Sequence, residues 1–172
     1  RRAGDYFSHM QVKNAIRLAT LTKAVIEYRE LGQYFPALWV STRSDYESLY
    51  SEYMEHVDAY QFVSACAQRC DKMFNMSAIG LIAFLSYEVH GAEKTNEFFN
   101  VLRVGCMGDM PKGDPRRTLL ETFINYQIKA KQKQRPTIQA NLIAKALRSY
   151  VKGQSIYLLK WLDSEGTIEV AK

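Results

Sequence analysis

The sequence predicts an all-α fold, a single compact domain spanning residues 1–172 with about seven helices around one central apolar helix at 77–90. Glycine and proline are scarce, at nine and four, and they fall between apolar-periodic segments instead of inside short alternating ones. Within those segments the apolar residues recur at three- and four-residue spacing, which is typical of amphipathic helices. Hydrophobic residues at 47% and charged residues at 24% are typical of a globular chain.

Capping residues and glycines bound the helices predicted in the first hundred residues. Residues 78–85 are apolar nearly all round, so this helix is expected to be the hub of the core. The tyrosine-rich, acidic segment 43–55 is expected to turn its tyrosines toward the core or a partner helix. The predicted helices are, in order, 12–31 ending before Gly32, 43–55 capped by Ser41 or Thr42, 58–73 capped by Asp58, 77–90 capped by Ser77 and ended by Gly91, and 92–104.

Two further helices and a tail are predicted after the glycine-rich break at 105–113. Asp114 followed by Pro115 is a strong helix start, and this helix should run to about residue 132. Thr137 is expected to cap the last long helix, which Gly153 ends. The tail from Ser155 to Trp161 is expected to be either a short strand or a packed extended segment.

The charge is concentrated in the C-terminal third of the chain. The net charge is +5, but residues 112–160 alone hold 11 Lys and Arg against only Asp114 and Glu121. Such a basic region is typical of a surface that meets phosphate backbone, and also of a lysine-rich surface that serves solubility. The residues predicted to contact nucleic acid are Lys129, Lys131, Lys133, Arg135, Lys145, Arg148 and Lys152.

The last long helix offers two versions of that contact. At 100° per residue Lys145, Arg148 and Lys152 fall within about 60° of one another, so they form one basic stripe suited to phosphates. As the second half of a helix-turn-helix, the same helix would instead turn Gln139 and Asn141 toward bases together with Lys145 and Arg148. The linker before it lacks the usual glycine turn, which favours the nonspecific version.

No pattern in the chain predicts a catalytic residue, a metal or a cofactor. Cys66 and Cys70 share a helical face and could hold zinc with His56, His90 or Cys106, but buried thiols are the simpler interpretation. Glu52 and Glu55 are interpreted as a solvated surface. The glycines between 105 and 113 lack the phosphate-loop pattern.

Localisation is predicted to be cytoplasmic, in a bacterium or a phage-infected cell. Three cysteines are too few for a disulfide scaffold, and no apolar run approaches the roughly 18 residues of a membrane span. The first residues carry neither an initiator Met nor a signal peptide, which favours a chain that begins inside a longer gene product.

Residues 105–161 resemble the C-terminal region of phage and mobile-element proteins that carry an N-terminal ParB/sulfiredoxin-like domain. The matching motifs are Gly113–Leu119, Arg135–Thr137, Leu142–Leu147 and Gly153–Trp161. The D-G-Q-H-R type motif of the ParB-like domain has no counterpart here, so no activity of that domain is transferred. The resemblance implies association with DNA in a phage or bacterial setting.

The leading hypothesis is therefore a non-enzymatic, DNA-associated accessory domain of a ParB-like phage protein. It would contact the nucleic-acid backbone through its basic C-terminal helical face. A rival hypothesis is a protein-interaction module without nucleic-acid contact, which would use the tyrosine-rich face of 43–55 or the aromatic segment 34–39 to bind a host or phage protein. An enzyme would need a polar pocket with perturbed titratable groups.

Overall fold

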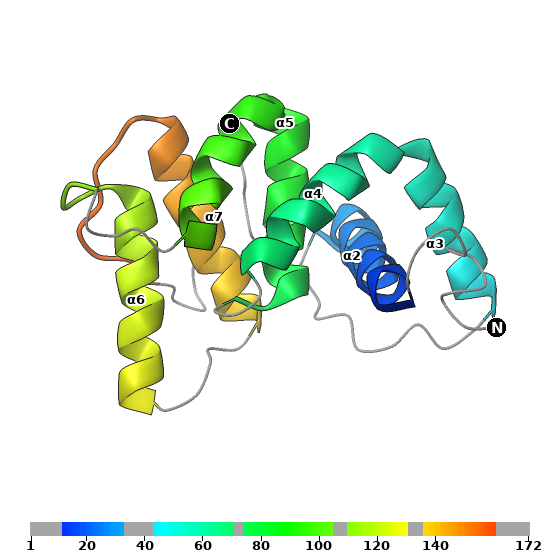
Figure 1. Cartoon of the computed structure of the whole chain (residues 1–172), viewed down its shortest axis with the longest axis horizontal. Helices are drawn as coiled ribbons and strands as arrows, with labels where there is room; N and C mark the ends of the chain where they lie inside the picture. Colours follow the sequence, from blue (N-terminus) through cyan, green and yellow to red (C-terminus); the bar gives the residue numbers. More distant parts are fainter. Residues whose placement is uncertain (1–11, 33–42, 71–73, 105–109, 131–135, 161–172) are drawn as a thin grey trace.

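The computed structural model describes residues 12–32, 43–70, 74–104, 110–130 and 136–160, and all regular structure in these ranges is helical. The fold class predicted from the sequence is confirmed. In Figure 1, α2 and α3 lie at one end of the molecule, α6 lies at the other, and α4, α5 and α7 lie between them. The helices are α2 (Val12–Leu31), α3 (Arg43–Glu55), α4 (Val57–Cys70), α5 (Met76–Val104), α6 (Pro115–Ala130) and α7 (Pro136–Val151).

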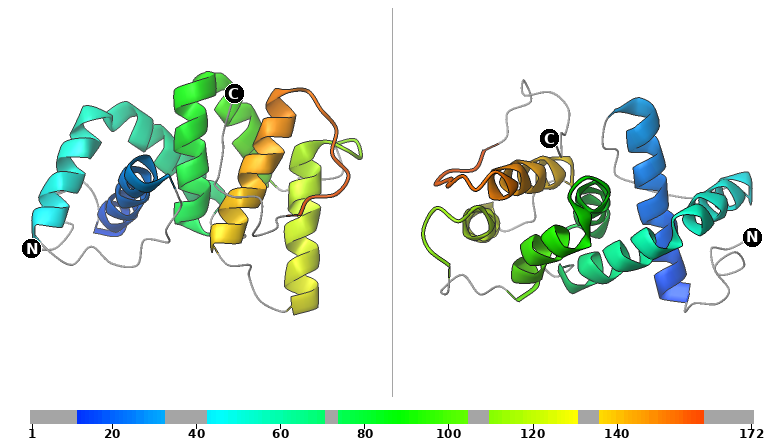
Figure 2. Two further views of the ribbon diagram at one scale, coloured as in Figure 1. Left: turned by 180° about the vertical axis from the view of Figure 1, so that it is seen from behind. Right: turned by 90° about the horizontal axis from the view of Figure 1, so that it is seen from above.

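The first half of α5 is the hub of the core, as its uniform apolarity predicts. Six of its side chains are fully buried, namely Ala78, Ile79, Leu81, Ile82, Ala83 and Phe84. They are enclosed because α5 packs against α4, α7 and α2 on different sides. Aromatic rings join it to the N-terminal helices, with Tyr60 of α4 stacked on Phe84 at a centroid distance of 4.6 Å. Both ends of the molecule therefore pack against the same helix (Figure 2).

Gly91 divides α5 into two helices, as its position after 77–90 predicts. Its φ of 86° and ψ of 171° are non-helical, and the chain changes direction there. A residue with a side chain rarely adopts this backbone conformation, which explains why position 91 is a glycine. The Ser86 and Thr95 hydroxyls form a buried hydrogen bond of 2.7 Å across the break. With the break counted, the described residues hold seven helical segments, the number expected.

Three predicted helix caps are wrong. Asn75, and not Ser77, caps α5, because its Oδ1 accepts from the backbone N–H groups of Ser77 and Ala78 at 3.1 and 3.2 Å. Asp58 lies inside the first turn of α4, where its charge favours the helix dipole without capping the helix. Thr137 lies inside α7, because that helix begins at Pro136. The proposed caps Ser41 and Thr42 lie outside the described residues.

The start of α6 follows the predicted Asp114–Pro115 signal. Asp114 Oδ1 accepts from the Arg116 backbone N–H at 2.9 Å, and the Arg116 guanidinium bonds back to the same carboxylate at 2.9 and 3.1 Å. Arg116 also lies 4.7 Å from the centre of the Tyr150 ring, and it donates to the Glu97 carbonyl. The cap therefore joins α6 to α5 and α7.

Residues 154–160 are a non-helical tail that forms no strand, and it is packed only in part, because Leu159 is buried and Ile156 half-buried while the other five residues are exposed. Ile156 N donates to the Gly113 carbonyl at 2.9 Å, and the Ile156 carbonyl accepts from the Thr118 hydroxyl at 2.7 Å. Gly113 has a φ of +92°, and a Cβ there would lie 2.9 Å from the Tyr157 ring, so the close approach of the tail requires glycine. The tail is thus anchored at the start of α6.

None of the helices in the described ranges is both long and apolar enough to cross a bilayer.

Candidate nucleic-acid interface

The structure brings together three of the seven basic residues predicted to contact nucleic acid. Lys145 and Arg148 lie on α7, and Lys152 follows directly after its last turn, so the three positions share one side of the helix. Together they line a surface hollow of about 330 Å3. We call it the basic hollow; its lining residues are Lys145, Arg148, Ser149, Lys152, Gln154, Ile156, Leu158 and Leu159.

The second wall of the basic hollow is the tail, and the end of α7 determines its path. Gly153, with a φ of +69°, ends the helix. Its N–H donates to the Tyr150 carbonyl at 3.1 Å, and the Gln154 N–H donates to the Ser149 carbonyl at 2.9 Å. This is a Schellman motif, which satisfies the last carbonyls of the helix and reverses the chain. Lys145 Nζ then donates to the Lys160 carbonyl at 2.5 Å, which links the two walls.

The electrostatics of the basic hollow favour an anion. Three cationic side chains line it, while the C-terminus of α7 adds only about half a negative charge. The same dipole stabilises cations near a helix C-terminus, so the positions of Arg148 and Lys152 suit the fold as well as an anion. Among the described residues that line it, the opposite wall carries no acidic side chain. A phosphate or another anion would therefore meet a net positive surface here.

Lys129 lies far from the basic hollow. It is exposed in the last turn of α6, which spans about 24 Å and runs antiparallel to α7 (Figure 2). The hollow is at the other end of this helix pair, where α7 ends and α6 begins. Lys131, Lys133 and Arg135 lie outside the described residues. A strand of nucleic acid that contacts both Lys129 and the hollow would have to run along the helix pair.

The helix-turn-helix version of the interface is wrong for its two amide residues. Gln139 is 1% exposed and Asn141 is 4% exposed, so neither side chain reaches a DNA base. Gln139 Oε1 instead accepts from the Asn75 backbone N–H at 2.6 Å, which ties α7 to the cap of α5. The spacing of Gln139 from Leu142, Ile143 and Ala146 puts it on the apolar face, a signal that the sequence contained.

The tail is the part of the interface that the sequence analysis missed. It predicted the basic stripe on α7 but assigned no functional residue between 153 and 161. The signal was the predicted helix stop at Gly153, because a left-handed residue at that position sends the chain back along the helix. Which face of α7 the returning chain covers depends on Gly113 and Thr118, about 40 residues away.

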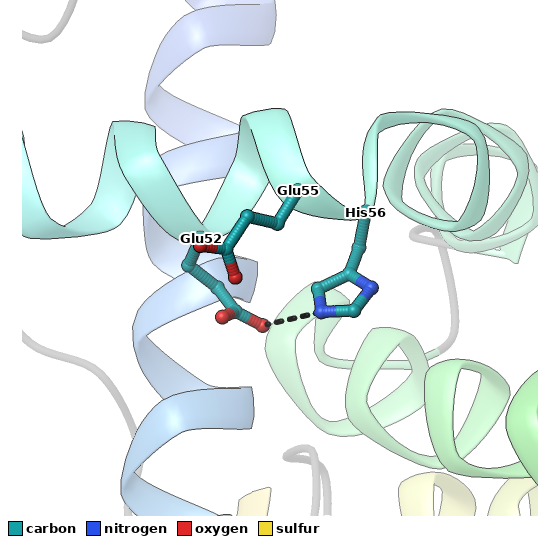
Figure 3. A group of neighbouring side chains, drawn as sticks. All are labelled: Glu52, Glu55 and His56. Atoms are coloured by element: carbon teal, nitrogen blue, oxygen red, sulfur yellow. Dashed lines mark ion pairs between the residues drawn. The ribbon is translucent and has the colours of Figure 1, made fainter.

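A second cluster of titratable groups lies between α3 and α4 (Figure 3). One ligand atom from each of Glu52, Glu55 and His56 lies within 4.8 Å of the others, so the cluster could hold a cation by distance alone. Glu52 is already engaged, since its carboxylate accepts from Arg29 at 2.5 Å and from the Tyr60 hydroxyl at 3.1 Å. His56 Nε2 lies 3.9 Å from the same oxygen.

Arg29 is the centre of this network and explains the acidic residues around it. Its guanidinium also donates to Glu88 of α5 at 3.0 Å and lies 5.1 Å from the centre of the Phe84 ring. Burial alone would lower the pKa of Arg29, but Glu88 and Glu52 raise it above its ordinary value. Burial and Glu52 raise the pKa of Tyr60, so its hydroxyl stays protonated and donates. The network is a structural joint of α2, α3, α4 and α5.

The cysteine and tyrosine predictions are partly covered by the described residues. Cys66 is buried in the core, as expected for a structural thiol, and it belongs to no metal-binding group among the side chains that the structure describes. Tyr53 is fully buried and Tyr50 packs against the core, as predicted for the face of α3. The side chains of Cys70, Cys106 and Tyr46 lie outside that set.

Comparisons with protein families, with characterised proteins and with solved structures returned no match to this chain. The resemblance of residues 105–161 to ParB-associated phage proteins therefore stays a prediction.

Proposed function

We propose that this chain is a DNA-associated accessory domain that contacts the nucleic-acid backbone through its basic C-terminal third. The observation that carries the proposal is the basic hollow, where Lys145, Arg148 and Lys152 face one surface depression. Phosphate contacts by Lys and Arg supply most of the affinity in nonspecific DNA binding. The buried Gln139 and Asn141 favour this backbone contact over recognition of a base sequence.

The rival function, binding of a protein partner, would need tyrosines that are part of the core. A protein partner at the tyrosine-rich face of α3 would need Tyr50 and Tyr53, yet Tyr53 is fully buried and its ring packs 6.1 Å from Tyr60. The other rival segment, 34–39, lies outside the described residues. Among the described residues the exposed large apolar side chains are spread over α3, α5, α6 and the tail. Of these, only Tyr157 and Leu158 are neighbours in the sequence, and Leu158 lines the basic hollow.

The proposal predicts a salt-dependent affinity that depends on named side chains. Three phosphate contacts give a log–log salt slope of about −2.7, so the affinity for a labelled duplex should fall about 40-fold between 50 and 200 mM salt. If Lys129, Lys131, Lys133 and Arg135 also contact phosphates, the slope should approach about −6.3. Fluorescence anisotropy of the duplex, titrated at several salt concentrations, measures this slope directly.

Two double variants distinguish binding at the basic hollow from a general attraction of DNA to the positive charge of the chain. Arg148→Gln with Lys152→Gln removes two cations from the basic hollow and leaves the Lys145 bond to the tail intact, so the slope should become shallower by about 1.8. Lys23→Gln with Lys94→Gln removes the same charge from α2 and α5, where both lysines lie beside glutamates, and should change the slope little. Equal losses in the two variants would contradict a binding site at the hollow.

A further inference from the structure

The two walls of the basic hollow differ in chemistry. One wall presents Lys145, Arg148 and Lys152 from α7, while the tail presents Ile156, Leu158 and Leu159. Leu158 is 70% exposed, although large aliphatic side chains are usually at least partly covered. A purely phosphate-binding surface has no use for this apolar wall. The pairing of cations with an apolar surface fits a ligand that carries an anion beside a flat, apolar group.

Tyr157 is the neighbour of Ile156 and Leu158 in the tail, although it does not itself line the basic hollow. Its ring edge lies against Gly113, yet the residue is 75% exposed. The backbone on its N-terminal side is fixed, because Ile156 bonds to Gly113 through its N–H and to Thr118 through its carbonyl. An aromatic ring held on an anchored backbone loses little conformational freedom when a flat group stacks on it. The tail therefore holds an exposed aromatic ring between Ile156 and Leu158, two residues that line the hollow.

An unpaired nucleotide has the required combination of groups. In a duplex the base faces are stacked inside the helix, so only phosphates and groove edges meet a protein surface. In a single strand each base exposes a face, and proteins bind such strands with a positive groove and side chains that stack on the bases. The hollow of about 330 Å3 lies at the lower end of the range of about 300–1,000 Å3 for small-ligand sites.

We propose that the basic hollow and Tyr157 bind one or two unpaired nucleotides of a single-stranded nucleic acid. This inference rests on the proposed function and names its preferred substrate. The phosphates contact Lys145, Arg148 and Lys152, and the bases lie over Leu158 and Tyr157. No base edge is read, because Gln139 and Asn141 are buried, so binding is expected to tolerate any base sequence.

The test compares three labelled probes at one salt concentration by fluorescence anisotropy. They are an oligothymidine, an abasic strand of equal length and a duplex of equal length. Loss of one stacked base costs about fivefold or more in affinity. The oligothymidine should therefore bind at least about fivefold more tightly than the duplex or the abasic strand. Equal affinity for oligothymidine and the abasic strand would overturn the inference, because the bases would then contribute nothing.

Variants locate the bases. Tyr157→Ala with Leu158→Ala should reduce oligothymidine affinity by about fivefold or more and leave duplex affinity unchanged. Tyr157→Phe keeps the ring and should bind like the unmodified chain, which controls for loss of the tail. Ile128→Ala removes a side chain that is equally exposed, at 68%, from the far end of α6 and should have no effect. Full affinity in the double alanine variant would overturn the inference.

The outcomes separate this inference from the proposed function. A duplex affinity that depends on Arg148 and Lys152, with no advantage for oligothymidine, overturns the inference and leaves the proposed function standing. Absence of binding to all three probes at low salt overturns both.

Discussion

The two ends of the molecule use their cations differently. In the part formed by α2 to α5 the described cations are paired within the fold: Arg29 joins Glu52 and Glu88, Lys23 lies near Glu27, and Lys94 lies near Glu97. In residues 112–160 the only two acids, Asp114 and Glu121, pair with Arg116 and Arg117. The segment holds nine other cations, and three of them, Lys145, Arg148 and Lys152, line the basic hollow.

The difference between these two sets of cations shows which charged residues indicate a function and which are explained by the fold. Arg29 is held by two carboxylates and a ring at a four-helix joint, so its presence is explained by the fold. The cations of the basic hollow instead line a surface depression beside an apolar strip. Like charges that line one depression repel one another, and a binding partner of opposite charge would relieve this repulsion.

Both ends of the molecule pack against α5, so the largest predicted effect is a substitution in α5 that unfolds both ends together. Ile82→Asp places a carboxylate at a fully buried position and should destabilise the chain by about 4 kcal/mol or more, enough to prevent folding of a marginal domain. Val89→Asp, on the exposed side of the same helix, should change stability by about 0.5 kcal/mol or less. Circular dichroism and urea unfolding measure both. A folded, cooperative Ile82→Asp variant would contradict the assignment of α5 as the hub.

The second prediction contrasts one arginine from each end. Arg29→Gln leaves the mostly buried Glu52 carboxylate without its main cation and should cost about 1–2 kcal/mol in the free energy of unfolding. Arg148→Gln removes a surface cation of the basic hollow and should cost about 0.5 kcal/mol or less. Urea midpoints at neutral pH give the two values. Equal losses would mean that Arg29 and Arg148 contribute equally to stability, which contradicts the contrast between a structural and a surface arginine.

Much of the fold was predictable because its signals are local. Gly91 and the Asp114–Pro115 pair act within one helical turn, and the structure places breaks and starts where they predict them. The cap of α5 was not predictable in this way. Asn75 and Ser77 are equally good caps in isolation, and the choice is associated with the hydrogen bond that the Asn75 N–H donates to Gln139, 64 residues away in the sequence.

The candidate site likewise has a part that local signals predict and a part that depends on contacts between distant segments. Helical spacing was sufficient to place Lys145, Arg148 and Lys152 on one side of α7, because their positions are fixed by one element. The apolar wall was not foreseen, since it requires the tail to return over α7 and to bond at Gly113. The burial of Gln139 could have been predicted, because it shares the face of Leu142 and Ile143. The prediction that it faces DNA bases used only the chemistry of its amide group.

The smallest predicted effect concerns Asp114, one of the two paired acids of residues 112–160. Burial would raise the pKa of Asp114, but hydrogen bonds from the Arg116 side chain and backbone, with the Arg116 charge, lower it below its ordinary value of 3.8. The folded state then binds this proton less tightly than the unfolded chain. The carboxylate therefore contributes its full stability above pH 3.8 and loses it as the pH falls through the folded pKa.

Asp114→Asn isolates that contribution. Asparagine is an equally good helix cap, so the turn is kept while the charge and the titration are lost. The variant should be slightly less stable than the unmodified chain at neutral pH, and the difference should shrink as the pH falls below 3.8. Urea unfolding at a series of acidic pH values measures the difference. If it stayed constant over that range, Arg116 would be held by its stacking on Tyr150, and the start of α6 would not depend on the Asp114 charge.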